Sequence, residues 1–542
     1  MNLATIKITV FNFLLIITVH LGVSIFFIRC NSGTNKTHST NNSINLKTTF
    51  NNRFLDSTIL ENFISNQDSL KRYRDQFFIF YKHRDFEYAW FDSNGMTEQA
   101  HNFFNLQNDL ISQLEDSSLY NIGLQQNYDW LNGDDTENKN KYDSISLLEE
   151  MKLTGQFFRY AEKIYHGSNL NVQDLGWFIP RKKINITKLL DSLVDGNKSP
   201  FAEYEPLNKQ YRLLENYLIK YNKLSKNTSW DSIPVNSRIM EGESNARITS
   251  IKKRLFLLGD AQELDTLPLY DTEFVFAVKR FQKRFGLTEN GHINANTIKK
   301  LNLTFYELIQ KILINMERAR WMPPDIANAD RIVVNIPDYK LSVYDSGKYS
   351  FSMPVVVGTS VYNTVIFSGK ISYIVFSPYW NVPTSITKNE LIPAMARNKN
   401  YLKNNNMEIT KYNSLIPEIR QKPGFNNALG KVKFLFPNKY NIYLHDTPNK
   451  DVFLKSKRSF SHGCIRIGSP EKLANFLLKR QPAYTTDSIK SLMNQDKEKW
   501  VNAKPQVQVV IKYFTAWVDE QGILNFREDI YGLDKKMSKK LF

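Results

Sequence analysis

Ser461-His462-Gly463-Cys464-Ile465-Arg466 is the stretch from which the fold and the chemistry of this chain are inferred. Cys464 is one of only two cysteines in 542 residues, and the other, Cys30, lies near the N-terminus. Free cysteines are often buried as small apolar residues. A thiol beside a histidine, with His445 upstream on a segment that alternates like a strand, is instead a candidate nucleophile with its base. We predict that His445 removes the proton of Cys464, because the thiolate is the reactive form.

The residues around this pair have candidate supporting roles. The backbone N–H groups of Gly463 and Cys464 are predicted to form an oxyanion hole, since glycine permits the tight backbone that aims such donors at a developing charge. Asp446, through its side chain or its backbone carbonyl, is expected to fix the tautomer of the His445 imidazole. Two further residues are expected to support the turn: Ser461 and His462.

This run resembles the signature of the L,D-transpeptidase (YkuD-domain) family, in which an upstream histidine is followed at a fixed interval by Ser/Thr-His-Gly-Cys. The 15 residues between His445 and Ser461 fit that interval. The blocks Arg420–Gly424 and Ile442–Pro448 are similar to the large, multidomain, envelope-anchored branch of the family. The resemblance runs from about residue 50 to the C-terminus and is strongest over 331–534.

The resemblance implies a peptidoglycan L,D-transpeptidase. Cys464 would attack the carbonyl of the third residue of a tetrapeptide stem and release the terminal D-Ala. An amine on a second stem would then resolve the thioester and create a 3→3 cross-link. Tyr379, Trp380 and Asn381 are expected to form a wall of the substrate cleft, and Arg466 is expected to bind a carboxylate or to brace its strand. No metal, nucleotide or other cofactor is expected.

Three alternatives from other functional classes stay open. Water could resolve the thioester and make the protein an L,D-carboxypeptidase, because that choice depends on how the cleft excludes water. His445, His462 and Cys464 are three potential zinc ligands, although two of them lie only two positions apart and no carboxylate base of a metallohydrolase accompanies them. A non-catalytic wall-binding scaffold that keeps the fold is the third.

The N-terminus predicts where the protein works. Ile8–Phe27 is an apolar stretch of about the length that crosses a bilayer, so residues 1–30 are predicted to be a signal anchor or an uncleaved signal peptide. Lipidation of Cys30 is less favoured, because Arg29 occupies the place of the usual small residue. The polar segment 31–50 is expected to be a disordered spacer. We therefore expect a protein of the periplasm and cell envelope, anchored to the cytoplasmic membrane.

Composition restricts the partners. The net charge is +17 and favours an anionic partner. No recognition-helix or zinc-finger spacing accompanies it, so nucleic acid is not expected, and cell-wall carboxylates are the anions that an envelope protein meets. A single thiol after the N-terminal segment excludes a disulfide framework. The sequence does not predict the oligomeric state.

The N-terminal half is expected to be helical. Apolar residues recur at helical spacing and predict an α-helical scaffold domain over 51–240. A small three-helix unit follows over 247–302, in which Ser250 is expected to cap the first helix. Its second helix and the following turn, Asp271–Gly291, resemble a peptidoglycan-binding module, and the alternative is a purely structural insert.

The C-terminal half is expected to be mostly β. A connecting helix over 304–322 is opened by a capping box of Thr304 and Glu307. Strand-like alternation then predicts a catalytic domain over 328–535 with one clear helix, capped by Ser469. Its long basic segment, about 386–431, has little strand character and is predicted to be a partly helical lid.

Overall fold

The computed structural model describes residues 53–114, 116–133, 138–180, 184–195, 207–229, 231–235, 239–323, 328–412 and 416–542. The chain divides into two units, 1–50 and 51–542, and the described residues all belong to the second. The predicted anchor at 1–30, the lipidation of Cys30 and the spacer at 31–50 fall outside the described residues. Within them, no helix has the length and apolar character needed to span a bilayer.

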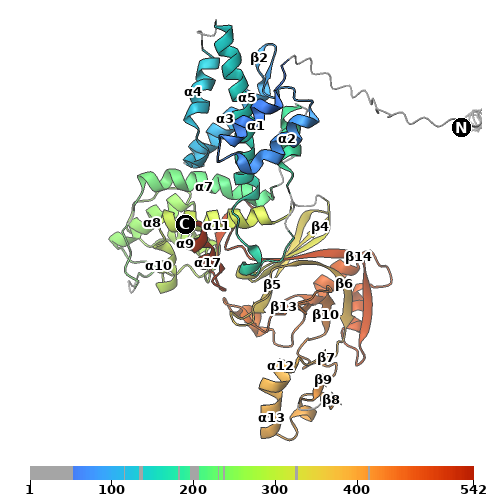
Figure 1. Ribbon diagram of the computed structural model, residues 1–542. Helices are drawn as coiled ribbons and strands as arrows, with labels where there is room; N and C mark the ends of the chain where they lie inside the picture. Colours follow the sequence, from blue (N-terminus) through green and yellow to red (C-terminus); the bar gives the residue numbers. More distant parts are fainter. Residues whose placement is uncertain are drawn as a thin grey trace, which may run out of the picture. The chain divides into compact units, whose positions relative to one another are not determined.

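Six α-helices, with short 3₁₀ and π segments, build the first part of the described chain around one core (Figure 1). They are α1 Ser57–Ser65, α2 Arg74–His83, α3 Glu98–Leu114, α4 Ile122–Leu131, α5 Lys139–Ala161 and α6 Ile186–Val194. Phe77 and Phe157 are fully buried in this core. Glu150 is buried there as well, and its carboxylate accepts hydrogen bonds from the backbone N–H groups of Ala89 and Trp90 at 2.6 and 2.9 Å. These bonds provide the partners that a buried carboxylate requires.

Helix α7, Lys209–Asn227, belongs to a different core although it follows the same helical series. It packs against α11, Phe305–Trp321, and the rings of Tyr221 and Phe305 lie 5.4 Å apart. The same core continues through the three-helix module into the β-domain. The region predicted as one helical scaffold, 51–240, therefore contributes to two cores.

The three-helix module consists of α8 Ala246–Leu258, α9 Thr272–Arg284 and α10 Ala295–Leu301. Asn245 caps α8 by accepting the N–H of Arg247 at 2.9 Å, so the expected cap at Ser250 is wrong. The module docks on the C-terminal segment, because Arg284 donates to the Leu524 carbonyl at 2.8 Å. The capping box that opens α11 is confirmed.

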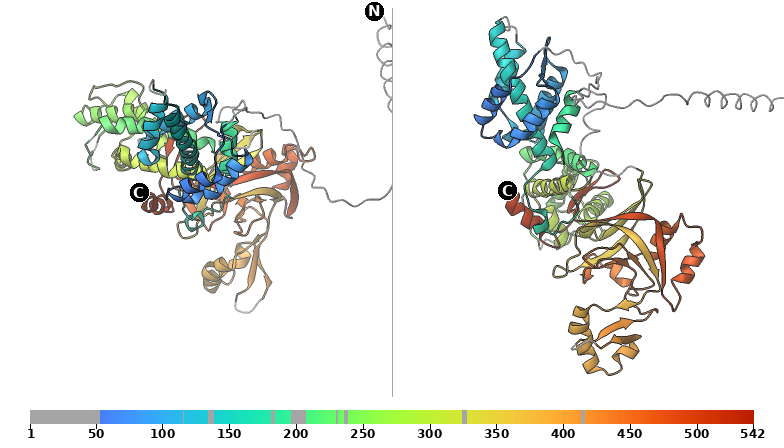
Figure 2. Two further views of the ribbon diagram at one scale, coloured as in Figure 1. Left: turned by 45° about the horizontal axis from the view of Figure 1, so that its top comes forward. Right: turned by 45° about the vertical axis from the view of Figure 1, so that its right-hand side comes forward.

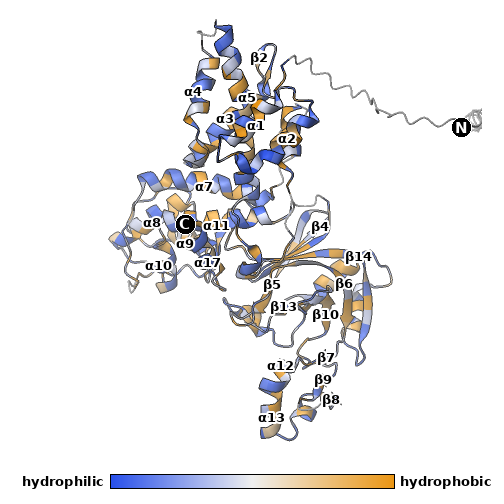
Figure 3. Ribbon diagram, in the orientation of Figure 1, coloured by the Kyte–Doolittle hydropathy of each residue, from blue (hydrophilic) through white to orange (hydrophobic). Residues whose placement is uncertain are grey.

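The C-terminal domain is built on one large sheet of nine strands in the order β12-β5-β13-β11-β10-β6-β14-β3-β4. The strands are β3 Arg331–Asn335, β4 Lys340–Asp345, β5 Lys348–Gly358, β6 Ser368–Phe376, β10 Val432–Leu435, β11 Leu444–His445, β12 Ser459–Ser461, β13 Ile465–Ile467 and β14 Lys499–Lys512. Strand β4 also pairs with β5, so the sheet closes on itself. Apolar stretches follow these strands in Figure 3 and form the core of the domain.

More helices accompany this sheet than the sequence predicts. The expected helix is α15, Pro470–Leu478, but the side chain of Ser469 makes no capping hydrogen bond. Two further helices were not predicted, α16 Thr486–Leu492 and α17 Leu533–Leu541. A buried Arg318 in α11 pairs with Asp534 in α17 at 2.6 Å. This pair ties the C-terminal helix to the connecting helix.

The segment predicted as a lid is a folded subdomain with strands as well as helices (Figure 2). The subdomain begins before the predicted segment, with β7 Trp380–Asn381 and α12 Thr384–Ile386, and continues with a π-turn Thr387–Leu391, α13 Ile392–Arg397, α14 Tyr401–Asn404, β8 Met407–Lys411 and β9 Glu418–Gln421. The strands pair in the order β7-β9-β8. Val382, Leu391 and Ile419 form a small core of its own. The expectation of little strand character is wrong, because this small core supports a second sheet.

Candidate active site

Two short parallel strands bring the predicted nucleophile and base to one place. Strand β11 pairs with β13 so that His445 lies opposite Arg466. Side chains alternate along a strand, so residues two positions apart share a face. Cys464 lies two positions before Arg466, and Tyr443 lies two before His445. The rings of Tyr443 and His445 lie 5.6 Å apart, and the Tyr443 side chain bonds to Cys464. These four residues, Tyr443, His445, Cys464 and Arg466, are called the thiol cluster below.

His445 is held as a neutral imidazole. Its side chain is buried, and Nδ1 lies 2.5 Å from the Asp446 carbonyl oxygen. A carbonyl can only accept, so Nδ1 carries the proton and Nε2 keeps a lone pair. Burial, followed by the nearby positive charge of Arg466, lowers the pKa of His445 to about 4. At neutral pH the residue is therefore an uncharged base.

Cys464 is half-buried and protonated in the resting site. Its thiol donates to the Asn441 carbonyl oxygen at 3.5 Å. Burial raises the pKa of Cys464, while hydrogen bonds from Tyr443 and the charge of Arg466 act in the opposite direction. Thiol and imidazole are therefore both neutral at pH 7. If this thiol acts as a nucleophile, its proton therefore has to be transferred as it attacks.

Arg466 brings an unsatisfied cation to the cluster. Its Nε is buried and has no hydrogen-bond partner among the residues that the structure describes. Burial lowers the pKa of Arg466, and a negative charge on Cys464 would oppose that shift. Buried donors are normally paired, and an arginine pairs best with a carboxylate. Arg466 is thus equipped to receive an anionic group beside the thiol.

A hydroxyl clamps the turn that carries the thiol. Gly463 has φ +112°, a conformation that strains other residues, although a Cβ there would meet neighbours only at ordinary contact distances. Ser461 Oγ accepts the Gly463 N–H at 3.2 Å and donates to the Cys464 carbonyl at 2.6 Å. The Gly463 N–H, which we expected in an oxyanion hole, is thus engaged within the turn. The Cys464 N–H remains as the candidate donor.

Asp446 acts on the site through its backbone. Its buried carboxylate accepts the Lys431 N–H at 2.9 Å and also pairs with Lys450. Only its carbonyl oxygen bonds to His445. Of the two possibilities left open by the sequence, the structure therefore has the carbonyl in contact with the imidazole.

His462 points away from the thiol cluster and contacts the lid subdomain. Its Nε2 lies 3.3 Å from Glu390 Oε1 in the π-turn that follows α12, and both side chains are about half-exposed. The ring of Tyr362 lies 5.0 Å from the imidazole. His462 therefore lies where the catalytic turn and the lid meet. Within the described ranges, no three His, Cys, Asp or Glu side chains are grouped as metal ligands.

The predicted cleft wall lies at the base of the lid. Trp380 and Asn381 form β7, which pairs with Arg420 and Gln421 of β9. The Arg420 guanidinium lies 4.2 Å from the centre of the Tyr379 ring. In the described part of the chain, no hydrogen bond, ion pair or ring contact joins these side chains to Cys464 or His445, so their substrate role stays a prediction.

Lys433 connects the base of the lid to the catalytic strands. It lies opposite His445 in the antiparallel pair β10–β11. Its Nζ donates to the Tyr379 carbonyl at 3.4 Å and lies 3.6 Å from Glu498. The sequence analysis missed both Lys433 and Tyr443 as site residues. Tyr443 carried a usable signal, because it lies two positions before His445 on an alternating strand.

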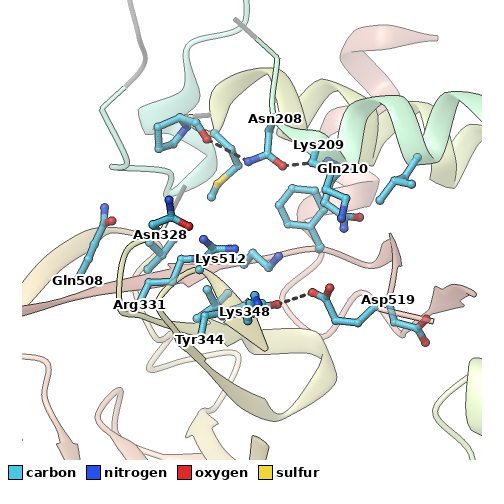
Figure 4. A pocket seen from close by; sticks show the side chains of 18 of the residues that line it. Asn208, Lys209, Gln210, Asn328, Arg331, Tyr344, Lys348, Gln508, Lys512 and Asp519 are labelled. Carbon is cyan, nitrogen blue, oxygen red and sulfur yellow. Dashed lines mark hydrogen bonds between the residues drawn. The ribbon is translucent and has the colours of Figure 1, made fainter. Parts of the chain in front are cut away.

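A cavity of about 450 Å³ lies away from the thiol cluster. It opens between the start of α7 and strands β3, β4 and β14 (Figure 4). Four basic side chains line it, Lys209, Arg331, Lys348 and Lys512, and two acidic ones, Asp519 and Glu520. Glu520 accepts a hydrogen bond from the Tyr344 hydroxyl at 2.9 Å. None of the predicted site residues lines this cavity.

Three segments match known domain families. Residues 329–485 match the L,D-transpeptidase catalytic domain (YkuD), residues 75–218 a domain described as the Scaffold domain, and residues 244–301 a family described as "Putative peptidoglycan binding domain". A curated relative from Haemophilus influenzae, named "Putative L,D-transpeptidase", is 32% identical over 274 residues. The match covers 47% of this chain and 55% of the relative, so the chain spans little more than half of that protein's length.

Solved structures similar to this chain were also found. An L,D-transpeptidase from Mycobacterium smegmatis is 11% identical with a TM-score of 0.20, and the match covers 34% of this chain and 58% of that one. An L,D-transpeptidase from Stackebrandtia nassauensis is 15% identical with a TM-score of 0.21, covering 51% of this chain and 94% of that one.

Proposed function

We infer that this chain, which carries an L,D-transpeptidase catalytic domain of the YkuD family after a scaffold domain and a peptidoglycan-binding domain, is a cysteine acyltransferase of peptidoglycan. The observation that supports this most is the thiol cluster, in which a free thiol, a neutral imidazole and a guanidinium with an unsatisfied Nε lie on one face of the sheet. The proposed substrate is a tetrapeptide stem. An amine of a second stem is the proposed acceptor.

The proposed reaction begins with the Cys464 thiol and the His445 imidazole both neutral. The Nε2 lone pair of His445 accepts the thiol proton as the sulfur of Cys464 attacks the carbonyl of the third stem residue. The electron pair of that carbonyl moves to oxygen, where the Cys464 N–H can donate to it. The C–N bond to D-Ala then breaks, and the leaving amine takes the proton from His445. The second amine then attacks the thioester carbonyl, the C–S bond breaks, and the proton lost by the amine passes through His445 to the sulfur, which leaves the free thiol and a 3→3 cross-link.

Arg466 has a proposed role in recognition. Stem peptides carry carboxylates, and a buried guanidinium with an unsatisfied Nε can bind one by charge-assisted hydrogen bonds. Tyr379, Trp380 and Asn381 would line the approach from the base of the lid. We also propose that residues 1–30 anchor the protein to the cytoplasmic membrane, which would place this site in the cell envelope.

Incubation with purified disaccharide-tetrapeptide, followed by mass spectrometry, tests the proposal. The wild-type chain should give a dimer that has lost one D-Ala, and Cys464→Ala should give none. A tripeptide monomer alone would identify an L,D-carboxypeptidase, since water would then resolve the same thioester. Unchanged substrate with both proteins would contradict an acyl-transfer function and favour a wall-binding scaffold.

A further inference from the structure

The loop between β5 and β6, residues 359–367, reaches the catalytic turn through Thr364. This side chain is only 1% exposed. Its hydroxyl donates to the Gly463 carbonyl oxygen at 2.7 Å and accepts the Gly358 N–H at 2.9 Å. Both hydrogen-bonding functions of the hydroxyl are therefore used, and one of them holds the peptide group next to the nucleophile.

This bond determines where the Cys464 N–H points. The Gly463 carbonyl and the Cys464 N–H belong to one planar trans peptide, so they point in opposite directions. A donor that fixes the carbonyl on one side fixes the N–H on the other. The Gly463 N–H is bound to Ser461, and no oxygen of the described residues accepts the Cys464 N–H. A hydrogen bond to the carbonyl also polarises the amide and makes its N–H a stronger donor.

Thr364 is itself held from the C-terminal segment. The Tyr531 hydroxyl accepts the Thr364 N–H at 3.2 Å and donates to the Gly358 carbonyl at 2.8 Å. The Tyr531 N–H donates in turn to the Tyr513 hydroxyl at 2.9 Å, and the two rings stack with their centres 5.5 Å apart. Tyr531 lies beyond the segment 329–485 that matches the catalytic family. The turn is thus supported by a part of the chain outside that match.

We propose that Thr364 is a positioning residue for acyl transfer, which aims the Cys464 N–H at the oxyanion and is kept in place by Tyr531. The inference rests on the proposed function. As the S–C bond forms, the carbonyl electron pair moves to oxygen and accepts a hydrogen bond from the Cys464 N–H. The pair returns when the C–N bond breaks and the amine leaves with the proton that His445 received.

Two reagents that react with the same sulfur separate this role from a general effect on the thiol. A carbapenem acylates a thiol through an oxyanion, in which the thiol sulfur bonds to the lactam carbonyl and the lactam C–N bond opens. Iodoacetamide alkylates the sulfur by displacing iodide, and no oxyanion forms at the reacting carbon. The full chain is treated with each, and adducts on the peptide that contains Cys464 are followed by mass spectrometry.

Cys464 in the Thr364→Val variant should be acylated at least about tenfold more slowly. Loss of an oxyanion donor lowers the rate about 10²–10³-fold, and a misdirected donor lowers it less. Alkylation of Cys464 in this variant should stay within about twofold of wild type. Thr364→Ser should restore acylation, because it keeps the hydroxyl. Thr359→Val is the matched control, since that hydroxyl accepts only the exposed Tyr362 N–H, and it should behave as wild type.

Other outcomes overturn the proposal. Unchanged acylation in Thr364→Val, or acylation and alkylation slowed by the same factor, would mean that Thr364 does not aim a donor. If Thr364→Val does not fold, Tyr531→Phe removes the outer support and should also slow acylation while sparing alkylation; no selective slowing would again overturn it. A wild-type chain that is alkylated but never acylated at Cys464 would overturn the proposed function itself, and this inference with it.

Discussion

The catalytic turn and the lid subdomain are held in very different ways. The turn Ser461–Arg466 is fixed by buried hydrogen bonds from Ser461 and Thr364 and by the strand pairing on both sides of it. The lid has a small core of its own, and its contact with the turn, between Glu390 and His462, is half-exposed. Buried bonds preserve geometry, whereas exposed ion pairs contribute little. We therefore expect the proposed chemistry to be prearranged and access to it to be adjustable.

Replacing the proposed base, His445, should cause the largest loss of acylation rate. His445→Gln removes the lone pair that accepts the thiol proton, and general-base catalysis is worth about 10²–10⁴ in rate. We expect Cys464 acylation by a carbapenem to fall by about that factor, measured by mass spectrometry. His462→Gln is the control on the lid side, and it should keep most of the rate. Equal losses in the two variants would contradict the assignment of His445.

Gly463→Ala tests whether the turn works through its backbone conformation. The φ of +112° should strain an alanine by about 1–3 kcal/mol, although the Cβ has room. Gly522→Ala is the matched control, because that glycine has φ +78°, and a Cβ there would meet no other atom within 4 Å. Both variants should melt at lower temperature, and only Gly463→Ala should lose acylation, by about tenfold or more if the Cys464 donor moves. Equal acylation rates in the two variants would mean that the backbone conformation at Gly463 does not contribute to acylation.

The pH dependence of acylation tests whether the His445 imidazole is neutral in the resting site. Because its pKa is lowered to about 4, His445 takes up a proton only when the pH falls to that region. The acylation rate should therefore change little between pH 5.5 and 8, and it should fall about tenfold per pH unit below pH 4 on protonation of the base. Stopped-flow acylation by a carbapenem measures this profile. A loss of activity between pH 6 and 7 would instead indicate a solvated imidazole.

The sequence predicted the parts of the site that lie close together along the chain. The Ser461–Arg466 run indicated the candidate nucleophile, and Thr304 with Glu307 predicted the start of α11, because a capping box is a local signal. The partners of the turn were not predictable, since Thr364 reaches Gly463, and Tyr531 reaches Thr364, only when the sheet has closed. The strands of the lid were missed for a similar reason. Their few apolar residues, such as Ile419, form a core only after the segment folds back on itself.

The smallest effect should come from the contact that joins the two regions. Glu390→Gln removes the carboxylate that lies 3.3 Å from His462 Nε2, and an exposed contact of this kind is worth about 0–1 kcal/mol, or less than about a fivefold change. We expect the KM for a stem peptide to change by no more than this factor and kcat to stay nearly constant. The contact joins the lid to the turn and does not involve Cys464. A double-mutant cycle with His462→Gln isolates the coupling. A large drop in kcat would mean that the lid takes part in the chemistry, and the contrast between a fixed turn and an adjustable lid would then fail.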